Sequence, residues 1–223
     1  MTATLSPTPR TTPTRGRNRA VAEREPLLDL LAAGLVAHLG VTAGSHPVVL
    51  PTAYAVDAAG PDDGGTLYLH GSVAAGWLGR ALESDVCVTV TELDGLVAAR
   101  SGFHHSMNYR SAVVIGRPRL VVDDAEKVRA LDAVVDHMVP GRSATLRPAT
   151  RKELAATVVL ALPLAEASMK QRATGPVDDP ADVVPGTWSG VIPVRRVAGE
   201  PVRADDADGE TPEHVTRRVA ALA

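Results

Sequence analysis

The chain has 223 residues, 45% hydrophobic and 22% charged, with a net charge of −3 and one cysteine, Cys87. This length suits one sizeable domain, and the charge balance gives no indication of nucleic acid or an acidic membrane surface as a partner. A single cysteine excludes an internal disulfide and any metal site built from cysteines. Since no apolar run can span a bilayer and no signal-peptide pattern opens the chain, we expect a cytoplasmic protein.

Composition divides the chain into three parts. Residues 1–19 are rich in Thr, Pro and Arg and lack hydrophobic periodicity, which predicts a flexible or extended arm. Residues 20–195 contain the apolar patterns and are expected to form a single domain. Residues 196–223 are polar, so we expect a poorly ordered tail or a short helix near residues 214–220.

Helices are predicted at a few places along the domain. Pro26 suits the first turn of a short helix that Gly34 can end. Asp123 caps a helix with apolar residues at 3.6 spacing, which ends at residues 140–141. Thr150 and Glu153 have the spacing of a capping box and open a further short helix.

The rest of the domain reads as strands. The expected strands cover residues 35–41, 47–56, 66–70, 85–92, 96–100, 111–116, 119–122, 157–162 and 168–172, and residues 188–194 are expected to form a last ordered element. Pro51 lies inside one of them, which must be irregular or open on one side there because proline donates no backbone hydrogen bond. The pair Asp94 and Gly95 is a tight-turn signal. Many short strands and few helices predict an antiparallel barrel with peripheral helices, and no pattern of a Rossmann fold is present.

The stretch from Thr66 to Arg80 reads as a strand, a glycine turn at Gly71 and a helix. Ser72 occupies the expected N-cap of that helix, so free backbone N–H groups would form a general anion site beside His70. The alternative is that Ser72 only caps the helix and that His70 has no ligand.

A dense polar block, S-G-F-H-H-S-M-N-Y-R-S, covers residues 101–111. Its hydroxyls, amide and guanidinium suit a phosphate or the carbonyl and imide edges of a ring. The alternative is a polar loop in which Arg110 pairs with a carboxylate such as Asp94 or Glu92. The histidines have no zinc-site spacing, and no residue is identified as a catalytic acid or base.

Four stretches together resemble a known family. They are P-V-V-L-P-T-A-Y at residues 47–54, L-Y-L-H-G-S at residues 67–72, D-G-L-V-A-A-R-S-G-F-H-H-S-M-N-Y-R-S-A-V-V-I-G at residues 94–116, and V-P-G-R with K-E-L-A-A-T at residues 139–157. They resemble the flavin-nucleotide-binding branch of the pyridoxamine 5'-phosphate oxidase-like superfamily, which also resembles nitroimidazole-resistance proteins. The resemblance covers about residues 15–195. It implies a mainly β fold, the FMN-binding split β-barrel, in a homodimer with flavin in clefts at the subunit interface.

The resemblance also implies which residues meet the cofactor. They are Val49, Leu50, Pro51 and Thr52; His70, Gly71 and Ser72; Asn108, Tyr109, Arg110 and Ser111; and Lys170 and Arg172. The first four would lie along the isoalloxazine ring, and the next three would meet the ring and the ribityl-phosphate chain. The polar four would complete the pocket, and the two basic residues would serve the phosphate end.

The chain departs from the vitamin B6 oxidases of this superfamily. Their R-x-V-L-L-K strand and Y-T-N-Y-x-S-R-K loop correspond here to H-P-V-V-L-P-T and L-H-G-S-V-A-A-G-W, so pyridoxamine phosphate oxidation is not expected. Some relatives bind haem through a histidine that matches His70, which would then be a metal ligand. Other relatives bind the deazaflavin F420.

Three functions therefore remain open. The leading hypothesis is a dimeric oxidoreductase that binds FMN, with FAD as another flavin candidate, and acts on a small-molecule substrate. The second is a haem protein or haem enzyme with His70 as axial ligand. The third is a non-catalytic cofactor-binding or regulatory module. Neither nucleic acid nor a membrane is expected as a partner.

Overall fold

The computed structural model describes residues 4–222, so the first three residues of the predicted arm and the last residue of the predicted tail lie outside the described part. The strands are β1 (Ala20–Val21), β2 (Ala37–Ala43), β3 (His46–Thr52), β4 (Tyr54–Asp57), β5 (Thr66–Ser72), β6 (Val86–Ala98), β7 (Ser106–Gly116), β8 (Arg119–Leu120), β9 (Thr157–Pro163), β10 (Ala167–Arg172) and β11 (Gly190–Pro193). The helices are α1 (Arg24–Ala33), α2 (Gly76–Glu83), α3 (Asp124–Met138), α4 (Arg151–Ala156) and α5 (Glu213–Ala221). The predicted mainly β, antiparallel fold with a few helices is confirmed.

The described residues form two compact units. Within the described part, the first unit draws on residues 4–34, Cys87–Ile115 and Glu166–Arg195, and the second on Leu35–Val86, Gly116–Ala165 and residues 196–222. Neither unit is a stretch of consecutive sequence. The boundaries expected at residues 19 and 195 therefore stay a prediction.

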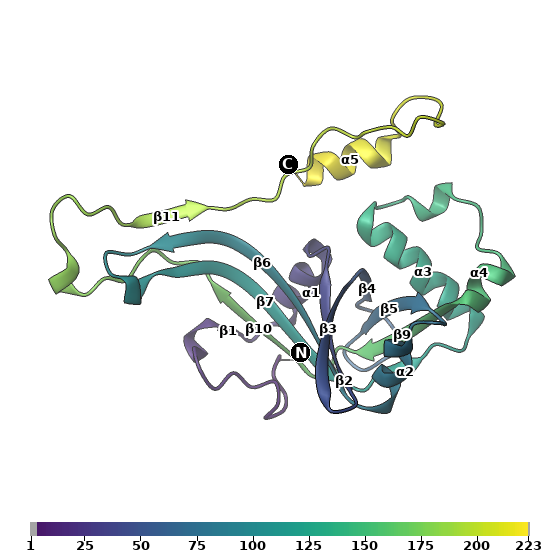
Figure 1. The fold of residues 1–223 in the computed structure, drawn as a ribbon, viewed down its shortest axis with the longest axis horizontal. Helices are drawn as coiled ribbons and strands as arrows, with labels where there is room; N and C mark the ends of the chain where they lie inside the picture. Colours follow the sequence, from purple (N-terminus) through teal and green to yellow (C-terminus); the bar gives the residue numbers. More distant parts are fainter. Residues whose placement is uncertain (1–3, 223) are drawn as a thin grey trace. The chain divides into compact units, whose positions relative to one another are not determined.

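The first unit is built on the strand order β1-β10-β7-β6, with β11 paired to β6 (Figure 1). β7 and β10 are antiparallel, with Tyr109 opposite Arg172 and Ser111 opposite Lys170. In α1, Leu27, Leu30 and Leu31 are fully buried, as the predicted helix requires. The side chains of this helix thus contribute to the core of the unit.

The tight turn predicted at Asp94 and Gly95 is wrong, because β6 runs without a break through both residues. A Cβ atom on Gly95 would lie 3.1 Å from a methyl group of Val191 and 3.2 Å from the carbonyl oxygen of Ile192. The glycine therefore gives space for the close approach of β11. The packing of β11, which is distant in sequence, thus explains Gly95, which the local sequence pattern assigned to a turn.

Part of the predicted N-terminal arm contacts the first unit. Leu5 is buried, and the N–H of Ser6 donates to the carbonyl of Ala167 at 2.8 Å. The hydroxyl of Thr8 donates to Glu166 at 2.6 Å, and Arg10 forms an ion pair with the same carboxylate. These contacts hold residues 5–10 beside the start of β10.

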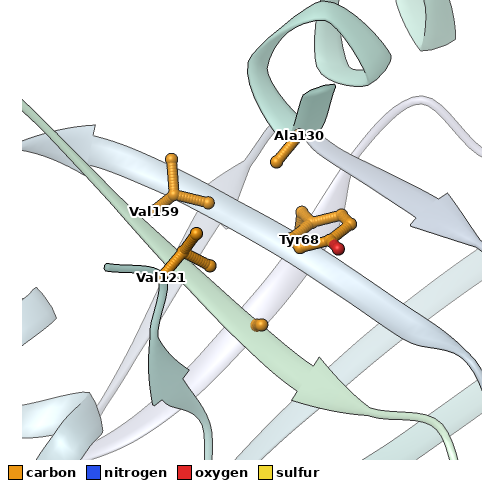
Figure 2. Close-up of a cluster of buried hydrophobic side chains, with 5 residues drawn as sticks. Tyr68, Val121, Ala130 and Val159 are labelled. Atoms are coloured by element: carbon orange, nitrogen blue, oxygen red, sulfur yellow. The ribbon is translucent and has the colours of Figure 1, made fainter. Parts of the chain in front are cut away.

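The second unit contains the β2–β3 hairpin and a four-stranded sheet in the order β4-β5-β9-β8. Helix α3 packs on this sheet: Ala130 lies against Tyr68 of β5 and Val159 of β9, with Val121 completing the cluster (Figure 2). Burial of this apolar surface is the main stabilising contribution at this contact.

The helix caps of the second unit agree with prediction. Asp123 accepts a hydrogen bond from the N–H of Glu126 and begins α3, and Thr150 and Glu153 form the capping box of α4. Helix α5 is the short helix expected near residues 214–220. None of the helices within residues 4–222 is long and apolar enough to cross a membrane.

The strand predicted at residues 47–56 is two strands, because β3 ends at Thr52 and β4 begins at Tyr54. Pro51 lies opposite His38 in the pairing with β2, and β3 is the last strand on its side of the sheet. The proline thus occupies an edge strand, where a missing backbone donor costs no ladder hydrogen bond. The predicted opening on one side at Pro51 is confirmed.

A partly buried polar network joins α3 to the sheet. The hydroxyl of Tyr68 donates to Glu126 at 3.0 Å, and the guanidinium of Arg119 donates to both Glu126 and Asp62 at 2.5–3.0 Å. Burial and the neighbouring Glu126 raise the pKa of Tyr68 to about 12. Hydrogen bonds from Arg119, with a smaller contribution from Tyr68, lower the pKa of Glu126 below its ordinary 4.5.

This network predicts acid-sensitive stability. A carboxyl whose pKa is lower in the folded state stabilises the fold above its unfolded pKa, and this contribution is lost as the pH falls through the folded pKa. The free energy of unfolding should therefore decrease below about pH 4.5. In Glu126→Gln it should be lower by about 1–3 kcal/mol at pH 7 and should decrease less on acidification. Urea denaturation at several pH values measures both, with the exposed Glu210→Gln as control. Parallel pH profiles for all three proteins would contradict the assignment.

Candidate functional site

The expected cofactor residues fall into separate groups on four strands. Val49, Leu50, Pro51 and Thr52 lie on β3, and His70, Gly71 and Ser72 end β5 in a different sheet of the second unit. Asn108, Tyr109, Arg110 and Ser111 lie on β7, and Lys170 and Arg172 lie on β10. The register of β7 and β10 brings the last six together in the first unit.

The β3 group lies on an open strand edge. Side chains of β3 alternate between exposed and half-buried, and Val49 is 62% exposed. An edge strand presents backbone N–H and C=O groups that no neighbouring strand uses. Such an edge suits the expected contact with the polar rim of a flat ring.

His70 is a half-buried histidine that makes no hydrogen bond with the described residues. Its Nδ1 atom is completely enclosed and has no partner. Burial lowers the pKa of His70 below its ordinary 6.5, so the imidazole is neutral at pH 7. A neutral imidazole is a common metal ligand, and here a metal could reach only the other ring nitrogen, Nε2, because Nδ1 is enclosed by the fold. The position is therefore chemically suited to the axial ligation of a haem iron.

The anion site predicted from a Ser72 N-cap is wrong. Helix α2 begins at Gly76, its N-cap is Ala75, and Ser72 instead ends β5. The hydroxyl of Ser72 accepts a hydrogen bond from the N–H of Ala74 at 3.2 Å, which favours a turn over a helix start. The N–H groups of the first turn of α2 are thus three residues further along than the sequence suggested.

Gly71 is explained by packing within the second unit. A Cβ atom at this position would lie 3.1 Å from both Trp77 and Leu78 of α2. That distance is tighter than ordinary van der Waals contact. The glycine lets α2 pack closely against the end of β5, whatever its relation to a cofactor.

Arg110 forms a two-pronged ion pair with Asp94 inside the first unit. Its Nε donates to Oδ2 at 3.1 Å and one terminal nitrogen donates to Oδ1 at 2.9 Å. The hydrogen bonds that Arg110 donates to Asp94 raise the pKa of the guanidinium. Of the alternatives that the sequence left open for Arg110, the structure shows the pairing with Asp94.

Arg172 is buried and serves as a tie between β7 and the segment after β10. One terminal nitrogen donates to Oδ1 of Asn108 at 2.5 Å and to the carbonyl of Thr174 at 2.9 Å. The other donates to the carbonyl of Gly175 at 2.9 Å. Lys170 also has an intramolecular contact, because its ammonium donates to the carbonyl of Arg15 at 2.9 Å.

A cavity of about 310 Å³ opens beside these strands in the first unit. Its wall includes Asn18, Arg19, Phe103, His104, Ser106 and Arg172. His104 and Ser106 belong to the polar block singled out in the sequence, whereas Asn18 and Arg19 were missed. Residues 1–19 have no periodic pattern, so only the folded chain shows that their last residues reach this wall.

The pairing with Asp94 gives a prediction that separates two roles for Arg110. Each side chain of the pair is about one-third exposed, so the pair should contribute only about 0.2–1 kcal/mol to stability. Arg110→Ala and Asp94→Asn should each lower the melting temperature slightly, and the double variant should be less than additive. Thermal denaturation of the four proteins without cofactor measures this coupling. If the decreases in melting temperature of the two single variants simply add in the double variant, the ion pair contributes nothing to stability.

The same two variants test cofactor contact. If Arg110 binds a cofactor, Arg110→Ala should lower the binding free energy by about 1.5–3 kcal/mol, whereas Asp94→Asn, which keeps the guanidinium, should not. Fluorescence titration with flavin measures both. Unchanged affinity in Arg110→Ala would exclude this residue from the site.

Comparison with known proteins identifies the family of the chain. The sequence profile of the pyridoxamine 5'-phosphate oxidase family matches residues 23–171, more than half of the chain. No curated protein sequence matches the chain significantly.

Several solved structures resemble the chain over most of its length. The flavocytochrome Anf3 from Azotobacter vinelandii is 35% identical, with 96% of this chain and 98% of that chain covered and a TM-score of 0.87. The FAD and haem binding protein from Mycobacterium smegmatis is 37% identical, with 90% and 97% covered and a TM-score of 0.83. A candidate 5-nitroimidazole antibiotic resistance protein from Bacteroides thetaiotaomicron is 20% identical, with 68% and 85% covered and a TM-score of 0.55, and shares the fold. The chain therefore belongs to the pyridoxamine 5'-phosphate oxidase family, in the split-barrel superfamily that the sequence motifs indicated.

Proposed function

We propose that this protein is a flavin-binding oxidoreductase that also binds haem through His70. The observation that carries the haem part is the half-buried, neutral imidazole of His70, which has no hydrogen-bond partner among the described residues. Two relatives at least 35% identical over at least 90% of this chain are a flavocytochrome and a FAD and haem binding protein. Flavin and haem, treated as alternatives by sequence reasoning, are thus proposed as joint cofactors.

Haem binding fits the chemistry of His70. Burial of the imidazole disfavours its charged form, so no proton has to be removed before it binds iron at neutral pH. Its position near the end of β5, opposite Val159 of β9, fixes the backbone that bears it. A ligand on a paired strand is held more rigidly than one on a loop.

Flavin binding fits the donor groups of the first unit. Asn18, Ser106 and Gln171 supply amide and hydroxyl groups around the cavity, and Arg19 supplies a guanidinium. A bound flavin would supply the hydride or electron chemistry, and the chain would hold and orient it. FMN, the flavin expected from the resemblance, stays a prediction, as do the alternatives FAD and F420.

The proposal for the substrate names a broad chemical class. A small-molecule substrate is proposed, and pyridoxamine phosphate is not expected because the basic residues of the vitamin B6 oxidases are missing from residues 46–52 and 69–77. The cytoplasmic location stays a prediction. A purely binding or regulatory role is the competing function, and turnover with NAD(P)H and an electron acceptor would exclude it.

Visible absorption spectra test the cofactor proposal. Protein reconstituted with both cofactors should show flavin bands and a Soret band. His70→Ala should lose or shift the Soret band and keep the flavin bands, since only the axial ligand is removed. His46→Ala, in which an exposed histidine is changed, is the matched control. Absence of flavin bands and of flavin-fluorescence quenching would contradict the flavin proposal, and an unchanged Soret band in His70→Ala would contradict the ligand.

We further propose that the protein is a homodimer. Large apolar side chains are exposed in the first unit, among them Val177 at 69% and Trp188 at 63%. A monomer rarely exposes many such side chains, and buried tryptophans often dominate interfaces.

Light scattering should therefore give twice the chain mass of 23.2 kDa at micromolar concentration. Trp188→Glu should shift the equilibrium toward monomer because a carboxylate is costly to bury. Val202→Glu changes another exposed apolar residue, in the second unit, and serves as control. A monomer with cofactor bound would contradict the dimer.

A further inference from the structure

The cavity of the first unit has an unpaired cation in its wall. Arg19 follows the left-handed turn at Gly16, which accepts a hydrogen bond from the N–H of Arg19 at 2.9 Å. The guanidinium of Arg19 makes no hydrogen bond or ion pair with the described residues. It is therefore available to a ligand, unlike the guanidinium of Arg172 in the same wall, which donates to three oxygens.

The acidic groups near this wall already have partners of their own or lie apart from Arg19. Asp178 is bound by Arg100, and Asp179 lies 3.3 Å from Nε2 of His104. Asp182 lies with Asp179 and His104 in one cluster. None of these carboxylates pairs with Arg19, so an incoming anion meets a free positive charge there.

An exposed aromatic ring borders the same cavity. Phe103 is 90% exposed, and its ring meets the ring of His104 edge-on, with the two planes at 87°. An edge-on contact leaves ring faces free for stacking. Stacking of a base on an aromatic face is a recurrent way to bind nucleotides without reading their sequence.

The remaining polar groups suit a sugar and a base edge. Ser106 provides a hydroxyl, and Asn18 and Gln171 provide amides that both donate and accept hydrogen bonds. A guanidinium for phosphate, an aromatic face for a purine and amides for polar edges are together the requirements of an adenosine diphosphate group.

The size of the cavity sets a limit on the ligand. Its volume of about 310 Å³ lies at the lower end of ligand pockets, which range from about 300 to 1,000 Å³. This space suits one half of a dinucleotide and not the whole molecule. The isoalloxazine half would therefore lie elsewhere.

We infer that the cavity at Arg19 and Phe103 binds the adenosine diphosphate half of a dinucleotide, which, resting on the proposed flavin function, is FAD. Arg19 then selects FAD over FMN, because FMN lacks the adenosine half that reaches the cavity. A nicotinamide dinucleotide contains the same adenosine diphosphate group and is the other source of this chemistry.

The test compares flavins on one protein. The dissociation constants of FAD and FMN are measured by fluorescence quenching for the wild type, Arg19→Gln and Phe103→Ala. Both variants should leave FMN binding unchanged. Arg19→Gln should weaken FAD binding about tenfold or more, since a lost charged hydrogen bond corresponds to at least that factor, and Phe103→Ala should weaken it about fivefold or more, since a stacking face is lost. Arg17→Gln, which changes an exposed arginine two residues away, should affect neither flavin.

Competition and calorimetry decide whether the adenosine diphosphate group belongs to FAD or to a nicotinamide dinucleotide. ADP should displace FAD and not FMN, and ADP should bind the cofactor-free wild type but not Arg19→Gln. If FAD has no advantage over FMN but Arg19→Gln weakens NADH binding to the FMN-loaded protein, the cavity binds the nicotinamide dinucleotide. Equal losses for both flavins, or no binding of ADP, FAD or NADH that depends on Arg19, would overturn the inference.

The two proposals fail in different ways. Absence of binding by either flavin would contradict the proposed function. ADP calorimetry on the cofactor-free protein would still decide whether Arg19 lines a site for adenosine diphosphate.

Discussion

The polar half of the first unit depends on one buried arginine, Arg172. Its side chain is more than nine-tenths enclosed, and a buried charge is tolerated only when its donors are used. Asn108 on β7 and the carbonyls of Thr174 and Gly175 accept its hydrogen bonds. These contacts fix the residues after β10 against β7 and so shape the wall of the cavity. The guanidinium that the sequence suggested for phosphate binding is thus part of the scaffold that positions other groups.

Residues that carry the family resemblance differ in what they do in the fold. Arg110, Arg172 and Lys170 have their hydrogen-bond donors engaged by Asp94, Asn108 and the carbonyl of Arg15. By contrast, His70 and Arg19 have no such partners among the described residues. Because an enclosed polar atom without a partner costs free energy, Nδ1 of His70 marks an unusual position, and the partly buried guanidinium of Arg19 is free to meet a ligand.

Local chemistry made the helices predictable from sequence. The N-cap of Asp123, the capping box of Thr150 and the C-cap of Gly34 each use residues within one turn of the helix they delimit. Most strands were located approximately, but β7 begins at Ser106, inside the polar block, and not at the predicted residue 111. Long-range packing decides another case. Gly95 looked like a turn residue, yet it makes room for β11, which is nearly one hundred residues further along the chain.

The candidate site was less predictable, for the same physical reason. Ser72 is a residue type that is favoured at N-caps. Its hydroxyl instead accepts a hydrogen bond from the N–H of Ala74 in a turn, and helix α2 begins at Gly76. Motif similarity identified His70, although no pattern in the sequence indicates that its Nδ1 lacks a partner. Arg19 carries no sequence signal at all, because only the folded first unit brings its segment to the cavity wall.

The central claim is that a group left without a partner in the fold, His70 above all, is the one that binds a cofactor. Chemical rescue tests it directly: haem-loaded His70→Gly is titrated with imidazole while its absorption and resonance Raman spectra are recorded. The spectrum of the wild type should be lost in the variant and should return as imidazole fills the space of the missing side chain. A variant that keeps the wild-type haem spectrum without imidazole would contradict the claim.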